Sequence, residues 1–305
     1  MAKRALLLIN RQARRGQEGF AQAMDCLDDL GFEIITVPAK KPQALSAYID
    51  YYAASVDRVI VGGGDGTLNQ VVSSLVKHQL PLGILPLGTA NDLARTLGIP
   101  HQIPAACEVI AQGHHKGVDL GQVNGHYYFN VASLGLSVDI TQKLTRGAKR
   151  RWGILAYGIT ALQVLGQVRP FHARLHYQDR QERIQTLQVA VGNGRYYGGG
   201  MAIAADATID DRRLDVYSLE LRHWWQIFDL LWHLPQGQQH LLPFVRTLAV
   251  ESIEIETSRP RPINTDGEIT TYTPARFQVV PNALTIFVPR PQPAPILSPA
   301  LIPPP

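Results

Sequence analysis

The sequence predicts an N-terminal three-layer α/β/α domain followed by a larger antiparallel β-sandwich domain. In residues 1–120, short apolar runs alternate with segments of helical spacing, a pattern typical of a parallel sheet with helices on both faces. After residue 120, short strand-like runs and turns dominate, as in all-β domains. We therefore expect domains at residues 1–120 and 121–289, followed by a proline-rich, disordered tail at residues 290–305.

The expected elements of the first domain follow one another with short connections. Apolar runs predict the strands, and helical spacing predicts the helices. The strands are expected at Ala5–Ile9, Phe32–Val37, Arg58–Val61 and Leu82–Pro86, and the helices at Gly16–Leu30, Pro42–Tyr52 and Leu68–Lys77. Ligands bind such sheets at the carboxyl ends of the strands. Asn10, Thr36 and the residues 62–65 fall at such ends, so we expect them to lie together at the opening of one binding site.

The second domain is expected to be built from short strands with helical insertions. The dipeptide Asn124-Gly125 is a strong signal for a hairpin turn. Strands are expected at Val123–Val131, Ala173–Tyr177, Leu187–Gly192, Leu214–Leu219, Val250–Thr257 and Phe277–Phe287. Helical insertions are expected at Trp152–Leu165 and Trp224–Leu234.

Composition narrows the class of protein. The chain has 305 residues, a formal net charge of +4 and a pI of about 9.1, which favours nucleotides, nucleic acid or an anionic membrane surface as partners. Cys26 and Cys107 lie far apart in helical runs, as expected for reduced thiols of a cytosolic protein. The ten histidines show no metal-ligand spacing. No run is long and apolar enough to span a bilayer, and the N-terminus predicts a first strand rather than a signal peptide.

The glycine-rich stretch after the third expected strand is the main candidate site. It reads Gly62-Gly63-Gly64-Asp65-Gly66-Thr67-Leu68. Glycines let a ligand approach backbone N–H groups at the start of a helix, where phosphate binds well. Asp65 would repel phosphate unless a cation lies between them, which predicts Mg²⁺ with a nucleotide. The position differs from a dinucleotide fingerprint, and no P-loop pattern occurs. The alternative is a plain strand-to-helix turn.

Further motifs make the sequence resemble a known family. With Leu87-Gly88-Thr89-Ala90-Asn91-Asp92, the glycine loop resembles the catalytic domain shared by diacylglycerol kinases, sphingosine kinases and bacterial lipid kinases. The resemblance is closest to soluble bacterial diacylglycerol kinase-like members. It covers about residues 1 to 290 in family order and includes the segments Phe129–Gly135, Gly198–Met201, Ile209–Val216 and Asn264–Glu268.

This resemblance implies an ATP site between the two domains, with Mg²⁺. The implied nucleotide-binding residues are Asn10, Thr36, Gly62, Gly63, Gly64, Asp65, Gly66, Thr67, Leu68 and Thr89. Asp65, Asp92 and Asp119 would form an acidic network linked through water to Mg²⁺. Taken alone, the second glycine turn would be an ordinary helix cap, and Asp119 a solvated turn.

The turn Asp266-Gly267-Glu268 is the candidate for proton removal. Phosphoryl transfer to an alcohol needs a carboxylate near the acceptor hydroxyl. The glycine allows a sharp turn that could aim both carboxylates in one direction. By resemblance, Glu268 accepts the proton and Asp266 assists or holds metal. Taken alone, these residues would more often form an exposed turn.

A second metal is implied at the acidic turn before the expected strand Leu214–Leu219. The family often holds a structural Mg²⁺ there through one aspartate and nearby backbone carbonyls. Mapped onto this chain, the ligands are Asp211 and the carbonyls of Thr208 and Arg213. Arg212 replaces the family's usual glycine, which changes the chemistry of the turn. A plain acidic turn is the alternative.

Two segments combine basic residues with aromatic ones, as at anionic membrane surfaces. One contains Lys143, Arg146, Lys149, Arg150 and Arg151 before Trp152, and the other contains Arg222 and His223 before Trp224-Trp225. A solvated charged face is the alternative for each segment.

The sequence therefore predicts an ATP- and Mg²⁺-dependent lipid kinase that phosphorylates a lipid hydroxyl, first of all that of diacylglycerol. We expect a cytoplasmic protein at the membrane periphery, with no nucleic-acid partner. The alternatives are a non-catalytic nucleotide-binding regulatory protein and a kinase of a non-lipid alcohol. A dinucleotide-dependent oxidoreductase fits least well because of the position of the glycine loop. The acceptor lipid, the activating lipids and the oligomeric state, homodimer included, stay open.

Overall fold

The computed structural model describes residues 3–10, 16–37, 45–143, 169–194, 196–197, 201–202, 208–221 and 241–290, with residues 226, 229 and 233. Several expected features lie outside these residues: the helix Trp152–Leu165, most of Trp224–Leu234, the basic residues 146 and 149–151, Arg222, His223, the glycine turn 198–200 and the tail from residue 291.

The first half of the chain contains a parallel sheet with the strand order β2-β1-β3-β4. Its strands are β1 (Lys3–Ile9), β2 (Phe32–Thr36), β3 (Arg58–Gly63) and β4 (Leu82–Pro86). The helices are α1 (Gly16–Asp29), α2 (Leu45–Tyr52, extended by the 3₁₀ turn Ala53–Ser55), α3 (Asp65–His78), α4 (Asp92–Thr96) and α5 (Ile103–Gln112). The α/β prediction is confirmed, although α3 begins three residues before the expected Leu68.

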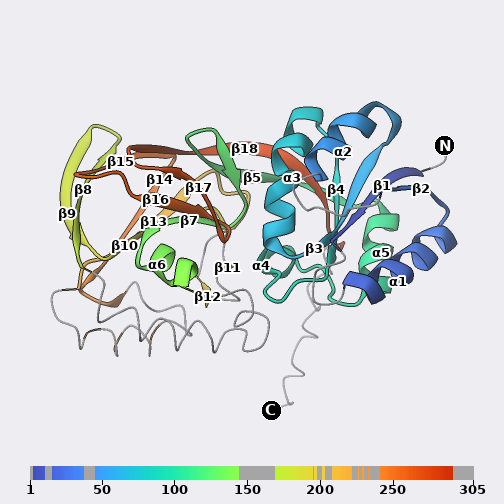
Figure 1. The fold of residues 1–305 in the computed structure, drawn as a ribbon, viewed down its shortest axis with the longest axis horizontal. Coiled ribbons are helices and arrows are strands. Elements are labelled where there is room, and N and C mark those ends of the chain that lie inside the picture. Colours follow the sequence, from blue (N-terminus) through green and yellow to red (C-terminus); the bar gives the residue numbers. More distant parts are fainter. Residues whose placement is uncertain are drawn as a thin grey trace, which may run out of the picture.

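Helices cover both faces of this sheet. Helices α1 and α5 pack together, as do α2 and α3, and the two pairs lie on opposite sides of the strands (Figure 1). The central strands are apolar because both faces are covered; every residue from Val59 to Gly63 is buried. Both cysteines are free thiols, and burial raises the pKa of Cys107 to about 12.

The second half is a sandwich of antiparallel strands. Its elements are β5 (His115–Val123), β6 (His126–Tyr128), β7 (Val131–Gly135), α6 (Leu136–Lys143), β8 (Phe171–Tyr177), β9 (Arg180–Thr186), β10 (Gln188–Gly192), β11 (Tyr196–Tyr197), β12 (Met201–Ala202), β13 (Leu214–Leu219), β14 (Val245–Val250), β15 (Ser252–Thr257), β16 (Pro262–Thr265), β17 (Glu268–Tyr272) and β18 (Ala275–Phe287). One layer has the order β14-β13-β10-β7-β16-β17, and the facing layer is built around β18, β15, β8 and β9.

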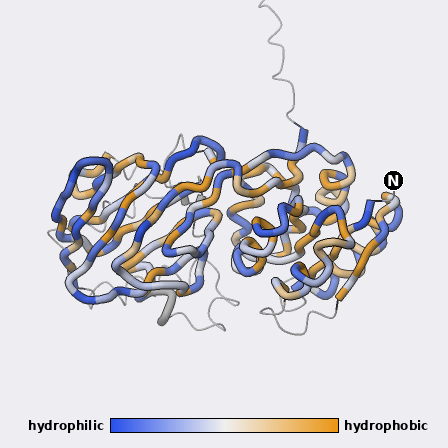
Figure 2. Tube along the Cα trace, turned by 90° about the horizontal axis from the view of Figure 1, so that it is seen from above, coloured by the Kyte–Doolittle hydropathy of each residue, from blue (hydrophilic) through white to orange (hydrophobic). Residues whose placement is uncertain are grey.

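The core of the sandwich lies between these layers. Tyr128 and Phe277 come from one layer, and Leu134 and Val191 from the other, and all are fully buried. The strands alternate between hydrophobic and hydrophilic residues, as Figure 2 shows, because one face meets the core and the other meets solvent. The predicted β-sandwich is confirmed, and the predicted hairpin at Asn124-Gly125 joins β5 to β6.

The long strand β18 joins the two halves. Near its start it pairs with β15, where Phe277 is opposite Ile253. After an irregularity between Val280 and Leu284, its end lies parallel to β4, where Ile286 is opposite Leu82. A continuous ten-stranded sheet therefore runs through both halves. The expected boundary near residue 120 stays a prediction, since β18 returns to the first sheet after the sandwich has formed.

We expect Ile286→Ala to destabilise both halves together. Ile286 is fully buried where β18 meets β4, so its truncation should cost about 2–5 kcal/mol. Urea unfolding followed by tryptophan fluorescence and by circular dichroism should shift as a single transition. Ile269→Ala, on the exposed face of β17, is the control and should cost less than about 0.5 kcal/mol. Separate transitions for the two halves would contradict the shared role of β18.

Candidate functional site

The two glycine turns pack against each other at the carboxyl ends of β3 and β4. Gly64 precedes α3, and its carbonyl accepts the first bonds of the helix, from the N–H groups of Thr67 and Leu68 at 2.9 and 3.2 Å. A Cβ on Gly88 would lie 2.5 Å from the Cα of Gly64, so a side chain there would force the turns apart. Beside Gly66, in contrast, the space is open. The first turn of α3 thus has room for a ligand at the positive end of its dipole.

Asp65 is held by the next glycine turn rather than left alone in the loop. Its carboxylate oxygens accept hydrogen bonds from the backbone N–H groups of Asp92 and Leu93, at 3.1 and 3.0 Å. The first residue of α3 therefore caps the start of α4, and these N–H groups stabilise its negative charge. These backbone donors are not apparent in the sequence, where a cation is the only expected partner of Asp65.

Asn91 shapes the second turn. It adopts a left-handed conformation, with φ of 52°, and its side-chain amide exchanges two hydrogen bonds with the backbone of Gly88, at 3.0 and 3.1 Å. Next to it, Asp92 is 4% exposed and lies 3.5 Å from Arg95. Thr89 is exposed at the tip of the turn. The structure thus brings Asp65 and Asp92 together and leaves Thr89 accessible.

Asn10 and Thr36, which follow or end strands β1 and β2, are two further residues expected to bind nucleotide, and they differ in their surroundings. Asn10 follows β1, and its side-chain amide donates to the hydroxyl of Thr67 at 3.2 Å. This contact shows that the segments following β1 and β3 lie side by side. Thr36 ends the outer strand β2, in register with Leu7, where it is exposed.

Asp266 enters the site from the opposite half of the molecule. With Gly267 it forms the turn between β16 and β17, and both residues have positive φ angles. Its carboxylate accepts backbone N–H groups of Phe129, Asn130 and Val131, at 2.7, 3.0 and 3.1 Å. Burial raises the pKa of Asp266 to about 7, the three donors oppose this shift, and the negative charge of Asp65 adds to it.

Because the charge of Asp65 contributes to the raised pKa of Asp266, the two carboxylates of the different halves influence each other electrostatically. A direct hydrogen bond also links the two halves there: the side-chain amide of Asn69, in α3, donates to the carbonyl of Thr265 at 3.3 Å. Asn69 lies four residues after Asp65 and therefore on the same face of the helix. Asn69 was missed in the sequence because its partner Thr265 lies 196 residues away, and helical spacing from Asp65 alone does not reveal that contact.

Glu268 has a different environment from Asp266. It begins β17 and is exposed, whereas the carboxylate of Asp266 is enclosed by the backbone of residues 129–131. The expectation that Gly267 aims both carboxylates in one direction stays a prediction, while the two carboxylates differ in exposure and in partners. The carboxylate of Asp266 is hydrogen-bonded to the backbone of residues 129–131, whereas Glu268 is exposed and accessible to a ligand.

Asp119 is also engaged by backbone donors. Its oxygens accept the N–H groups of Arg212 and Asn282, at 2.7 and 2.8 Å, so the side chain joins β5 to a turn and to β18. The buried side chain of Asn193 donates to the carbonyls of Asp119 and Phe129, both at 2.9 Å. Asn193 lay in no recognisable local pattern and was missed.

Among the described residues, no three His, Cys, Asp or Glu side chains gather into a metal site. The pair Asp65 and Asp92 nevertheless fits a hydrated Mg²⁺, which commonly uses one or two carboxylates with substrate phosphates and retains water. At the second expected site, Asp211 accepts N–H groups from Thr208 and Arg213, which is a different arrangement from the expected carbonyl ligands.

Comparison with known proteins identifies the family. Residues 4–123 match the model of the diacylglycerol kinase catalytic domain, and residues 130–288 match that of the YegS C-terminal NAD kinase β-sandwich-like domain. A Pseudomonas aeruginosa protein named probable lipid kinase YegS-like is 32% identical over 95% of this chain and 96% of its own length. The chain belongs to the diacylglycerol kinase catalytic-domain family.

Other members of the diacylglycerol kinase family agree with this assignment. A diacylglycerol kinase of Staphylococcus carnosus is 27% identical over 95% of this chain and 96% of its own length. A solved structure from Bacillus anthracis str. Sterne has a TM-score of 0.82 and 25% identity, covering 94% of this chain and 96% of that one. The family-specific order of domains is therefore present from β1 to β18.

We expect Gly66→Ala to separate stability from ligand binding. Alanine is favoured over glycine in a helix, so the free energy of unfolding should rise by about 0.5 kcal/mol. The new methyl group enters the open space where a nucleotide would approach, so the affinity for MgATP should fall about tenfold or more, as measured by calorimetry. Ser73→Ala, exposed on the same helix, is the control and should leave affinity unchanged. Unchanged affinity in Gly66→Ala would move the ligand away from this turn.

We expect Asp266 to make stability fall with rising pH. Its pKa is about 7 in the folded chain, against an ordinary value of 3.8. Between these values the folded chain holds more protons than the unfolded chain, so the free energy of unfolding decreases as pH rises through this window.

The comparison with Asp266→Asn isolates this contribution. The variant should be less stable overall, because an amide oxygen replaces two carboxylate oxygens facing three N–H donors. Its unfolding free energy should nevertheless decline less steeply between about pH 4 and pH 7 in urea titrations. Identical pH slopes in both proteins would show that Asp266 titrates normally.

Proposed function

We propose that this protein is an ATP- and Mg²⁺-dependent lipid kinase that transfers the γ-phosphoryl group to a lipid hydroxyl. The observation that carries the proposal is the meeting of two sites across the two halves. The space beside Gly66 is open, and Asn69, three residues later in the same helix, contacts Thr265 in the half that carries Asp266 and Glu268. Membership of a kinase family supports this chemistry.

The nucleotide would bind at the glycine turns. Backbone N–H groups at the start of α3 suit phosphate oxygens, and Asn10, Thr67 and exposed Thr89 would add polar contacts around them. Thr36, at the exposed end of β2, would contact the more distant part of the nucleotide. Such positioning contributes much of the catalysis of phosphoryl transfer.

Asp65 and Asp92 would hold Mg²⁺ through its water ligands. When bound with ATP, the ion neutralises charge that develops on the transferred phosphoryl group. Both oxygens of Asp119, like those of Asp65, already accept backbone N–H groups, so each of these carboxylates would act on the ion only through its water ligands.

Glu268 would accept the proton of the lipid hydroxyl. It is exposed at the start of β17, so an alcohol can reach it, whereas Asp266 is held by three backbone donors. Asp266 would fix the turn that presents Glu268. General-base catalysis needs the carboxylate within hydrogen-bond reach of the hydroxyl.

Diacylglycerol is the first acceptor to test, since relatives are named lipid kinase or diacylglycerol kinase. Among the described residues, no helix is long and apolar enough to cross a membrane. We propose a cytoplasmic protein that reaches its substrate from the membrane surface, to which the basic net charge is suited. The non-catalytic alternative loses support at Arg212, which adopts φ of 59°, the conformation that the family's glycine favours.

We expect Glu268→Gln to reduce transfer of the γ-phosphoryl group about 10²–10⁴-fold, because the amide cannot accept the proton. The assay offers labelled ATP with mixed micelles of diacylglycerol, phosphatidylglycerol or sphingosine, and mass spectrometry identifies the product. Binding of MgATP should be unchanged. Glu254→Gln, exposed on β15, is the control and should retain full activity. Undiminished transfer by Glu268→Gln would exclude Glu268 as the base.

A further inference from the structure

The turn before β13 concentrates negative charge. It contains Asp210 and Asp211, Asp215 follows in β13, and Asp119 contacts the same turn through the N–H of Arg212. The family resemblance places a structural divalent cation here. Four neighbouring carboxylates would repel one another unless cations or N–H donors compensated them.

The backbone of the turn already satisfies Asp211. Its Oδ2 accepts the N–H of Thr208 at 3.1 Å, and its Oδ1 accepts the N–H of Arg213 at 3.3 Å. These are the two residues whose carbonyl oxygens were expected to bind metal. The carboxylate of Asp211 therefore closes the turn by itself.

A guanidinium group lies where a bridging cation would be needed. Nε of Arg213 is 3.2 Å from Oδ2 of Asp211 and 3.7 Å from Oδ1 of Asp215. All three side chains are partly buried, with 33%, 20% and 17% of their surfaces exposed. Partial burial reduces screening by solvent, so this cation compensates both carboxylates more strongly than an exposed one would.

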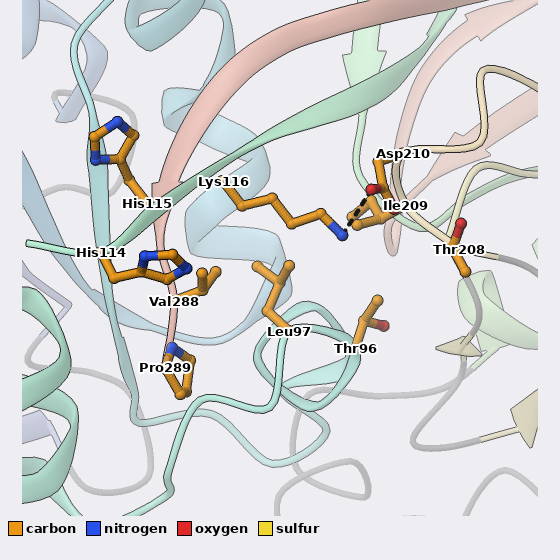
Figure 3. Close-up of a pocket in the computed structure, with 10 residues that line it drawn as sticks. All are labelled: Thr96, Leu97, His114, His115, Lys116, Thr208, Ile209, Asp210, Val288 and Pro289. Atoms are coloured by element: carbon orange, nitrogen blue, oxygen red, sulfur yellow. Dashed lines mark ion pairs between the residues drawn. The ribbon is translucent and has the colours of Figure 1, made fainter. Parts of the chain in front are cut away.

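The other two aspartates also have protein partners. Nζ of Lys116, at the start of β5, lies 2.8 Å from Oδ2 of Asp210. Figure 3 shows this ion pair on the wall of a pocket of about 370 Å³, where the Lys116 side chain extends toward the turn. Asp119 accepts the N–H of Arg212 at 2.7 Å. Each of the four carboxylates is thus matched by a donor or cation of the chain.

We propose that the guanidinium of Arg213 replaces the divalent cation at this turn, so that the turn is complete without metal. Mg²⁺ requires oxygen ligands at about 2.0–2.1 Å in nearly octahedral geometry. An ion at Asp211 would have to displace a permanently charged guanidinium that already contacts the same oxygen. This inference does not depend on the proposed kinase activity.

Metal analysis of the full-length chain tests the proposal. The protein is purified without chelator or nucleotide, desalted, and measured by inductively coupled plasma mass spectrometry. We expect well below one divalent ion per chain, and thermal unfolding that is the same in EDTA and in millimolar MgCl₂ or CaCl₂. Bound metal would instead make the unfolding temperature depend on its concentration.

The variant Arg213→Met should create the metal dependence that the natural chain lacks. In EDTA its unfolding temperature should fall by about 2 °C or more, and Mg²⁺ or Ca²⁺ should restore part of this loss. Arg212→Met is the matched control. Among the described residues, Asp210 pairs with Lys116, and Asp211 and Asp215 pair with Arg213, so this variant removes a neighbouring positive charge that those pairs do not use, and it should show no response to metal.

About one tightly bound divalent ion per natural chain, lost in Asp211→Asn and accompanied by a lower unfolding temperature in EDTA, would overturn the proposal. The metal content of the natural chain decides this point even if Arg213→Met fails to fold. Kinase activity is not part of the readout, so failure of the proposed function would leave the result intact.

Discussion

The arrangement of the candidate site depends on carboxylates that accept backbone N–H groups from distant parts of the chain. Asp65 holds the start of α4, Asp266 holds the segment between β6 and β7, and Asp119 holds both β18 and the turn before β13. A hydrogen bond to a charged group contributes about 1.5–3 kcal/mol, against about 0.5–1.5 kcal/mol for a neutral one. These carboxylate–backbone hydrogen bonds therefore fix the positions of turns that the local sequence alone does not determine.

The same contacts change how the acidic residues are interpreted. In the sequence, six acidic residues in or near turns indicate metal and proton chemistry, namely Asp65, Asp92, Asp119, Asp211, Asp266 and Glu268. In the structure, Asp266 and Asp119 use both oxygens to hold backbone, and Asp211 does the same within its turn. Only Glu268 has an exposed carboxylate among the residues expected to act directly on the acceptor. An acidic residue near a site thus needs its partners identified before it can be assigned to chemistry.

Sequence patterns predicted the helices and strands that are determined by neighbouring residues in the chain. The buried strand before Gly62 and the alternation of strands with helices follow from the pattern of neighbouring residues, and both were confirmed. Strands β9 and β17 were missed because they lie at sheet edges and carry few apolar residues. The partner of Asp65 is 27 residues away and that of Asp266 is 137 residues away, so no local pattern reveals them. Asn193 and Asn69 were missed for the same reason.

The rigidity produced by these carboxylate–backbone hydrogen bonds suits the proposed chemistry. Phosphoryl transfer requires little covalent participation by the protein, and catalysis depends on aligning the acceptor hydroxyl with the γ-phosphate. The glycine turns and the Asp266 turn come from different halves, yet β18 pairs with β4 in one half and with β15 in the other, and Asn69 bonds directly to Thr265. A shift of one half would therefore have to break sheet pairing as well as a side-chain contact. In the proposed function, the fold would thus supply the alignment, and exposed Glu268 would meet the acceptor.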